Sequence, residues 1–423
     1  MTSETSPIVR EAITEAIEGH RNQLLQLSHR IGTNPELAFE EFQASAMVAD
    51  VLEQAGFDVE RGAYGLPTAI EAAFGNGDCT VALVAEYDAL PGIGHGCGHN
   101  VIAGAAVGAA LALKGVADAL NLRVKLLGAP AEEKGGGKIL MLERGAWDDA
   151  DFSLMVHGFT GPQLPCEAFT AQSLEHLNVT FTGRTAHAAA APHEGINAAD
   201  AATLAQVALG LLRQQLKPGI VIASFIENGG AASNIIPGRT DLQVEVRASE
   251  ENDWIETSAR VRACLEGAAL ASGCQVDIRQ SEKPYAPMLH HPDIARYWDG
   301  NIADLGYQIE APAGSGGGGS TDMGNISQYL PSIHPCVVFK GSEAVPHTVE
   351  FAEAAVSPAG DKAVIDGALA LALTVANVAA DGELLASLRR LRIERSALAS
   401  RKGEDAAVLS EAARACLPMR RSR

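Results

Sequence analysis

Short apolar runs bounded by turn residues alternate with longer apolar segments in the first 160 residues. Residues 80–87, 122–128 and 152–157 have the length and composition of buried strands. Residues 101–113 are rich in Ala and predict a buried helix, and residues 8–56 carry apolar side chains at spacings of three and four, which predicts helices. Strands that alternate with helices predict an α/β domain with a mixed, mostly parallel sheet.

The pattern changes after about residue 169, where polar and apolar side chains begin to alternate. The expected elements are a strand over 175–182, a helix over 197–215, strands over 220–227 and 239–248, a helix over 254–271 and a strand over 275–280. This β-α-β-β-α-β order predicts a separate α+β domain of ferredoxin-like type, inserted into the first domain.

The domain organisation follows from these two patterns. We expect a main domain formed by residues 1–168 and 286–380, an inserted domain over 169–285, and a C-terminal helix and tail over 381–423. Contact between two copies of the inserted domain would give a homodimer with twofold symmetry.

Composition and charge narrow the class of protein. The net charge of −20 argues against nucleic acid or an anionic membrane surface as a partner. The seven cysteines show no disulfide pattern, the first 21 residues lack the apolar core of a signal peptide, and the longest apolar runs, 101–113 and 367–373, are too short to span a bilayer. These features predict a cytoplasmic protein with free thiols.

Side chains of the types that bind metals or transfer protons follow the predicted strands. They are Cys97, His99, the adjacent pair Glu132 and Glu133, His157 and, much later, His347. Most of them lie at the carboxyl end of a strand, where open α/β sheets bind their ligands. Thiolate, imidazole and carboxylate together are the ligand types of a hydrolytic metal centre.

The number of ligands favours two metal ions. Two tetrahedral sites offer about eight coordination positions, which five side chains fill only if one side chain and one water each bridge both ions. Two such cations would acidify the water and polarise a carbonyl oxygen. Glu132 is then the expected general base, because neighbours on an extended segment point to opposite sides and only Glu133 would face the metals.

Each residue taken alone also has an ordinary structural interpretation. A Cys-x-His pair arises often by chance, a Glu-Glu pair is usually a solvated surface, His157 could be a core histidine, and His347 could be a loop residue. The combination of these residues, with several at strand ends, is what indicates a site.

Several segments in a fixed order resemble the M20 metallopeptidase family, and within it the amidohydrolase subfamily, near aminobenzoyl-glutamate hydrolase subunits and M20 domain-containing dipeptidases. The segments are Asp-Ala-Leu-Pro at 88–91, Gly-Cys-Gly-His-Asn at 96–100, Pro-Ala-Glu-Glu-Lys-Gly-Gly-Gly-Lys at 130–138, Thr-Gly-Arg-Thr-Ala-His at 182–187, Asn-Ile-Ile-Pro-Gly at 234–238 and Ser-Thr-Asp-Met-Gly-Asn at 320–325. The resemblance covers about residues 10–380. Asn100 stands where much of the subfamily has Asp, which fits the aminobenzoyl-glutamate and dipeptidase branch.

The resemblance implies roles for individual residues. Cys97, His99, Glu133, His157 and His347 would be metal ligands, Glu132 the catalytic base, and the inserted domain a lid and dimerisation domain. His187 resembles a lid histidine that reaches the active site of a neighbouring subunit and stabilises the oxyanion. Asn234 and Arg247 resemble lid residues that bind the substrate carboxylate, although an ion pair between Arg247 and Glu245 is a competing interpretation.

The glycine-rich segment at 314–320 contains a formal G-x-G-x-x-G, but no strand precedes it and no acidic partner for a ribose is placed, so a dinucleotide site is not expected. No Gly-Lys-Ser/Thr follows, which excludes a P-loop. We expect a loop whose backbone approaches the substrate, with Gly318 and Gly319 in the substrate-binding set. The sequence has neither a G-x-S-x-G elbow nor an H-E-x-x-H motif.

Together these features predict an amidohydrolase that holds two divalent metal ions, Zn²⁺ or Mn²⁺. Its substrate would be a small amide whose leaving group bears a carboxylate: an N-acyl or N-aroyl amino acid, aminobenzoyl-glutamate or a dipeptide. One alternative is a non-catalytic binding or assembly subunit. Another is a cysteine nucleophile at Cys97 partnered by His99, which is weaker because residues so close in one loop rarely align for proton transfer.

Overall fold

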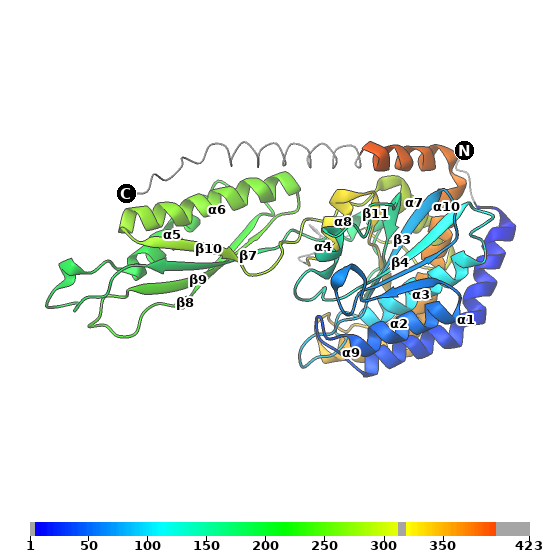
Figure 1. The fold of residues 1–423 in the computed structure, drawn as a ribbon, viewed down its shortest axis with the longest axis horizontal. Helices are drawn as coiled ribbons and strands as arrows, with labels where there is room; N and C mark the ends of the chain where they lie inside the picture. Colours follow the sequence, from blue (N-terminus) through cyan, green and yellow to red (C-terminus); the bar gives the residue numbers. More distant parts are fainter. Residues whose placement is uncertain (1–4, 312–318, 395–423) are drawn as a thin grey trace, which may run out of the picture.

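The computed structural model describes residues 5–311 and 319–394 of the chain. Figure 1 shows two units side by side: a larger α/β unit, coloured blue to cyan and yellow to red, and a smaller unit, coloured green, formed by the middle of the sequence. The chain passes from the first unit to the second and back, so the smaller unit is an insertion.

The larger unit is built on a six-stranded sheet with the order β1-β2-β4-β3-β5-β11. Its strands are β1 (Asp58–Arg61), β2 (Ile70–Phe74), β3 (Cys79–Glu86), β4 (Leu122–Ala129), β5 (Phe152–Leu154) and β11 (Ser332–Ile333). The pairs β3–β4, β3–β5 and β5–β11 are parallel, whereas β1 and β2 are joined antiparallel at one edge. The predicted mixed, mostly parallel sheet is therefore confirmed.

Helices bury both faces of this sheet. They are α1 (Pro7–Thr33), α2 (Phe42–Gln54), α3 (His99–Lys114), α4 (Gly137–Leu142), α7 (Pro292–Asp304), α8 (Met323–Tyr329), α9 (Val349–Ala355) and α10 (Pro358–Ala380). Helices α1, α2, α3 and α10 share one hydrophobic cluster with Leu83, and α4 and α8 share another with Val84. Leu83 and Val84 are neighbours on β3 and face opposite ways, so the strand is buried on both sides. Burial on both sides explains why its sequence is a nearly continuous apolar run.

Helix α10 is longer than the apolar run at 367–373 suggested. By length and composition it could cross a membrane, so the expectation that this run was too short is wrong. However, 83% of its most apolar window is buried inside the protein, chiefly against α3 and α1. A mostly buried core helix passes the same test, so this feature is weak evidence for a membrane span.

The smaller unit, which we call the lid, is a four-stranded antiparallel sheet with the order β10-β7-β9-β8. Its elements are β7 (Glu175–Thr182), α5 (Ala198–Arg213), β8 (Val221–Asn228), β9 (Arg239–Arg247), α6 (Glu251–Ser272) and β10 (Gln275–Gln280). Both helices cover one face, and the hydrophobic cluster between helices and sheet lies wholly within residues 177–278. The predicted β-α-β-β-α-β order matches this arrangement element by element.

The two connections between the units pair with each other. Leu174 and Tyr285 exchange two backbone hydrogen bonds of 2.9 Å and form an isolated antiparallel bridge. This bridge lies close to the boundaries that we expect at 168/169 and 285/286. The C-terminal helix expected after residue 381 is present over 382–394, and the rest of that prediction lies outside the described residues.

Two expectations about strands were wrong. The sequence analysis missed β1 and β2, which are short and only partly buried. The run at 152–157 is not one strand: β5 ends at Leu154, and β6 (His157–Phe159) pairs with β12 (Cys336–Val338) in a separate two-stranded sheet. Pro335 lies between the partner strands β11 and β12, and because it has no N–H it interrupts the ladder.

Candidate metal centre

The loop after β3 begins the site. It ends at Gly98, whose φ of +78° favours glycine and which directly precedes α3, so His99 is the first residue of that helix. Cys97 stands just before this turn. A buried strand, a glycine-rich loop and a buried helix thus fix the thiol and the imidazole at the carboxyl edge of the sheet.

The structure brings the five expected metal ligands together. One group contains Cys97, His99 and His157, and another contains Cys97, Glu133 and His347; within each group the ligand atoms lie within 4.8 Å of one another. Cys97 belongs to both groups. His99 and Glu133 recur in a third group with Glu132, so the three groups share members and form one cluster.

His99 is oriented by Asp88. Its Nδ1 lies 2.8 Å from the Asp88 carbonyl oxygen and 3.1 Å from Asp88 Oδ1, so Nδ1 carries the proton and donates it. Nε2 is buried and has no hydrogen-bond partner among the described residues. Burial favours the neutral ring, but the charges of Asp88 and Glu86 outweigh it and raise the pKa of His99. An imidazole held by a carboxylate on one nitrogen, with the other free, is the usual arrangement of a histidine that binds a metal.

His157 and His347 approach the thiol from other elements. His157 donates from Nδ1 to the Gly158 carbonyl oxygen at 2.6 Å, and its Nε2 lies 3.3 Å from Cys97 Sγ. His347 has a φ of +66°, which is unusual for a residue other than glycine, and its amide donates to the Gly96 carbonyl oxygen at 2.8 Å. His347 is exposed, so it forms the solvent side of the cluster.

Glu132 and Glu133 do not point to opposite sides, and that expectation was wrong. They lie in a turn rather than an extended segment, and one carboxylate oxygen of each is 3.8 Å from His99 Nε2. Ala131 begins the turn with a φ of +60°, and its amide donates to buried Glu41 at 2.9 Å. Such a backbone conformation persists because the surrounding contacts hold it.

The glycines after Glu133 have a packing reason. A Cβ at Gly137 would lie 1.8 Å from the Pro130 carbonyl oxygen, and Gly136 has a φ of +68°. Any larger residue at these positions would therefore push α4 away from the turn that carries the two glutamates.

A fully buried group of charges lies behind the two glutamates. The Lys138 ammonium lies between Glu86 and Asp322, 2.5 Å from Asp322 Oδ1, and the Lys138 amide donates to Asp322 Oδ2 at 2.9 Å. The other Glu86 oxygen is 3.4 Å from His99 Nε2. Carboxylate oxygens of Glu86, Glu132 and Asp322 lie within 4.8 Å of one another, and Lys138 supplies the positive charge beside them.

Burial and neighbouring charges shift the pKa values of the cluster. Burial, together with the charge of Glu133, raises the pKa of the Cys97 thiol. Burial, then the charges of Glu86 and Glu133, raises the pKa of Glu132 well above its usual range. Burial lowers the pKa of His157 to about 4, so this imidazole is neutral and able to bind a cation.

These residues fit a pair of divalent cations. His99 Nε2 and Glu133 Oε1 are buried polar atoms that have no hydrogen-bond partner in the part of the chain that the structure describes, and such atoms are costly unless something pairs with them. In the same cluster, the raised pKa values of Cys97 and Glu132 mean that their ionised forms are unfavourable. Bound cations would relieve both conditions, and would favour the thiolate form of Cys97.

The remaining expected site residues lie on or near the lid. His187 is exposed in the loop between β7 and α5, and its Nδ1 accepts from the amides of Ala189 and Ala190 at 3.3 and 3.1 Å. Asn234 is also exposed, and its carbonyl oxygen accepts from the amide of Ala188 at 3.0 Å. These two residues are thus neighbours on the lid, and neither belongs to the metal-ligand groups among the described residues.

Arg247 connects the lid to the larger unit. Its Nε donates to Glu245 at 2.6 Å, which is the competing ion pair, and its Nη1 donates to Ser320 Oγ at 3.3 Å. At Gly319 a Cβ would meet no atom of the described residues within 4 Å, so packing against them does not require glycine there. Gly318 lies outside the described residues.

Sequence reasoning missed the residues that support the site, namely Glu41, Glu86, Asp88, Lys138, Tyr285 and Asp322. Tyr285 is an example: its hydroxyl donates to the Glu132 carbonyl oxygen at 2.6 Å from the connection to the lid. Glu86 and Asp88 could have been noticed, because they come directly after a buried strand. Glu41 and Tyr285 give no such indication, since they are distant in sequence from every ligand.

Comparison with known proteins identifies the family. A family model described as peptidase family M20/M25/M40 matches residues 82–365. Xaa-Arg dipeptidase of Mus musculus is 36% identical over 401 residues, which cover 90% of this chain and 92% of that protein. A p-aminobenzoyl-glutamate hydrolase subunit of Escherichia coli is 34% identical over 289 residues, which cover 63% of this chain and 59% of that protein.

Among solved structures, the Bacillus subtilis YXEP protein, described as a dinuclear metal binding peptidase from the M20 family, superposes with a TM-score of 0.65. It is 21% identical, and the match covers 85% of this chain and 99% of that one, so the fold is the same. The matched sequence model, the relatives and the fold agree with the residues gathered around Cys97: the chain belongs to peptidase family M20/M25/M40.

Proposed function

We propose that this hydrolase cleaves an amide bond whose leaving group is an amino acid with a free carboxylate, and that it uses two divalent cations. The observation that carries the proposal is that the five expected ligands lie in two groups joined by Cys97, and that Glu132 lies in a third group with His99 and Glu133. When bound by Cys97, His99, Glu133, His157 and His347, Zn²⁺ or Mn²⁺ would polarise the substrate carbonyl and acidify a water molecule.

Among possible substrates, we propose a dipeptide with a basic C-terminal residue as the first candidate. The mouse relative that spans nearly the whole chain is named an Xaa-Arg dipeptidase. Aminobenzoyl-glutamate is the second candidate, because the named Escherichia coli relative covers a smaller part of this chain.

Glu132 would be the general base that takes the proton from water and gives it to the leaving nitrogen. Burial and the charges of Glu86 and Glu133 raise the pKa of Glu132, which brings its proton affinity nearer to that needed at neutral pH. Tyr285 and the Gly136–Gly137 turn hold the backbone of this residue in place. The carboxylate would therefore need little reorganisation during proton transfer.

On the lid, we propose that Asn234 and Arg247 bind the carboxylate of the leaving residue, together with the backbone at Gly319. His187 would donate a hydrogen bond to the oxyanion. Its Nδ1 accepts from two amides, so Nε2 is the nitrogen that is available to donate.

We propose a homodimer formed through the lid. Leu204, Val207 and Leu211 lie on one side of α5 and are 42%, 55% and 66% exposed, which is unusual for a helix of a monomer. Strand β8 lies at the edge of the lid sheet, where a second copy could pair with it. Sedimentation analysis should show a dimer that V207D dissociates; a wild-type monomer would contradict this part of the proposal.

The cysteine-nucleophile alternative is disfavoured by the surroundings of Cys97. A reactive thiol needs positive neighbours that lower its pKa, but burial and Glu133 raise the pKa of this one. Cys79, Cys97, Cys166, Cys264, Cys274 and Cys336 are free thiols, which fits the reducing cytoplasmic setting that we propose.

The decisive experiment combines metal analysis with a substrate panel. We expect purified protein to bind about two Zn²⁺ or Mn²⁺ per chain and to hydrolyse at least one dipeptide, N-acyl amino acid or aminobenzoyl-glutamate. A chelator should abolish hydrolysis and added metal should restore it. Full activity after complete metal removal would overturn the proposal, and metal binding without hydrolysis of any substrate would favour the non-catalytic alternative.

A further inference from the structure

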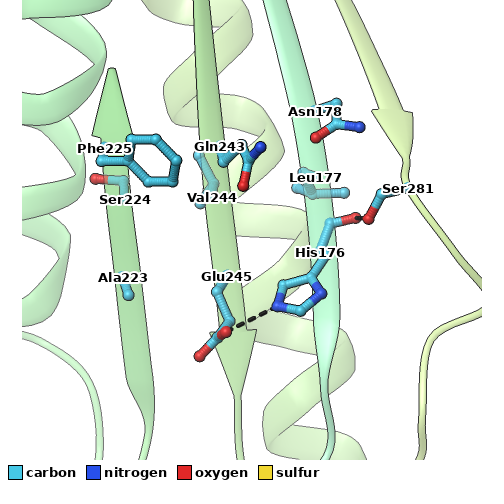
Figure 2. Close-up of a pocket in the computed structure, with 10 residues that line it drawn as sticks. All are labelled: His176, Leu177, Asn178, Ala223, Ser224, Phe225, Gln243, Val244, Glu245 and Ser281. Carbon is cyan, nitrogen blue, oxygen red and sulfur yellow. Dashed lines mark hydrogen bonds and ion pairs between the residues drawn. The ribbon is translucent and has the colours of Figure 1, made fainter. Parts of the chain in front are cut away.

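A pocket of about 280 Å³ lies on the lid, on the sheet face that the helices leave open. Figure 2 shows its walls: Ala223 and Phe225 on β8, Gln243 and Glu245 on β9, and His176 on β7. The Phe225 ring is 52% exposed and gives the pocket an apolar side, whereas Glu245 and His176 form a polar end. The volume suits one long side chain better than a whole ligand.

The polar end is a chain of half-buried charged groups. Glu245 accepts from Arg247 Nε at 2.6 Å and lies 2.8 Å from His176 Nε2, while Nδ1 of the same ring is 3.0 Å from Glu282. The side chains of His176, Glu245 and Glu282 are 37%, 26% and 24% exposed. This end of the pocket thus gathers the carboxylates of Glu245 and Glu282 around the His176 ring, with the Arg247 guanidinium bound to Glu245.

The pocket shares a lining residue with a hollow beside the metal centre. A second hollow of about 580 Å³ is lined by the metal ligand candidate Glu133 and by Ser281 and Glu282. Ser281 lines both hollows, and Glu282 is bonded to His176 in the first. A substrate with its amide near Glu133 could therefore extend its leaving residue past Ser281 onto the lid.

We propose that this pocket receives the cationic side chain of the leaving residue, an arginine or a lysine, and that Glu245 is the residue that selects it. The proposal rests on the proposed function, in which Arg247 binds the carboxylate of the same residue. The apolar stem would lie against Phe225, and the cationic head would bind Glu245.

An exchange of ion pairs explains the selectivity. When the substrate carboxylate binds Arg247, Glu245 loses its guanidinium partner. Of the two contacts described above, Glu245 then keeps the one with His176. A cationic substrate side chain replaces that partner, so every charge remains paired. A neutral side chain leaves a partly buried carboxylate without its partner, which disfavours binding.

The test compares two dipeptides of nearly equal shape, Ala-Arg and Ala-citrulline, with metal-loaded enzyme. Wild type should have a kcat/KM about 10- to 100-fold higher for Ala-Arg, as expected for a charged hydrogen bond. In E245Q this ratio should fall to about 1 to 3. The matched control is D241N, which makes the same kind of change further along the same face of β9, where Asp241 pairs with Arg239, and should retain the wild-type ratio.

Two outcomes would overturn the proposal. In the first, E245Q keeps the wild-type ratio, whether or not kcat/KM falls for both substrates. In the second, E245Q changes the oligomeric state, which would indicate that a partner chain fills the pocket. Wild type that cleaves both dipeptides equally would refute the subsite but leave the amidohydrolase intact. If no amide is cleaved, the proposed function fails, and calorimetry with L-arginine and L-citrulline still tests the pocket. Arginine should then bind about 10-fold or more tightly than citrulline, and only in the presence of Glu245.

Discussion

Two mixed clusters of acidic and basic residues differ in burial. At the carboxyl edge of the larger sheet, the side chains of Glu86, Lys138 and Asp322 are at most 1% exposed. On the open face of the lid, His176, Glu245 and Arg247 are between 24% and 37% exposed. Buried charges cannot change partners without a large desolvation cost, whereas half-exposed ones can exchange a partner for a ligand. The first cluster can therefore hold catalytic groups rigidly, and the second can adapt to a substrate.

The largest effect is expected at the buried edge, from E132Q. Removal of the proposed base should lower kcat by about 10²- to 10⁴-fold, because proton transfer from water loses its acceptor. Metal content, measured by elemental analysis, should not change. The neighbouring variant E133Q should instead lose metal, and the assignment of roles within the pair would be wrong if the two variants behaved alike.

The second prediction concerns the stability of the buried cluster. K138M should lower the free energy of unfolding by about 3–5 kcal/mol, because it leaves Glu86 and Asp322 buried without their cation. Denaturant titration followed by circular dichroism measures this. The control is K283M, which breaks an ion pair with Glu143 that is 41% and 50% exposed and should cost less than about 1 kcal/mol. Equal losses would remove the distinction between buried and exposed charges.

A pH experiment extends the comparison to the helix-covered face of the lid. Glu175 is 3% exposed and bonded to Ser258, Arg262 and Gln280; burial opposes its ionisation, yet these hydrogen bonds outweigh burial and lower its pKa below the ordinary 4.5. A carboxyl whose pKa is lower in the folded state stabilises the fold above about pH 4.5, and this contribution is lost as the pH falls through the lowered value.

E175Q should therefore lower the stability of the lid by about 1–3 kcal/mol at pH 7 and by less at pH 3. Thermal unfolding at both pH values measures the difference. E256Q is the control, because that carboxylate lies on the same unit at 72% exposure. A loss independent of pH would show that Glu175 acts through packing rather than charge.

The smallest effect is expected on the open lid face, from R247K. An ammonium cannot reproduce the fork of the guanidinium, so kcat/KM should fall about 10-fold, mainly through KM. Metal content and the unfolding midpoint should stay at wild-type values. A change in the midpoint as large as that of K138M would mean that Arg247 serves structure, and the contrast between the two clusters would not hold.

Only part of the site could be predicted from the sequence. Cys97, His99 and Glu133 could be found because each follows a recognisable buried strand, and the topology of a parallel sheet brings such positions to one edge. The mutual orientation of Glu132 and Glu133 was predicted wrongly, because a turn held by Glu41 replaces the extended segment that was assumed. His187, Asn234 and Arg247 were predicted as site residues only through the family resemblance, since the periodicity of the lid says nothing about substrate.

The sequence by itself determined most of the segments that become strands and helices, because hydrophobic period and turn residues act over a few neighbours. The exceptions are β1, β2 and the break between β5 and β6. It also determined the ferredoxin-like order of the lid and the kinds of ligand available for metal. Only the tertiary structure decided which charges are buried together, such as Lys138 with Glu86 and Asp322, and which remain exchangeable, such as Glu245 with Arg247. Those pairings join residues far apart in the chain, and their strength depends on solvent exposure, which no local pattern contains.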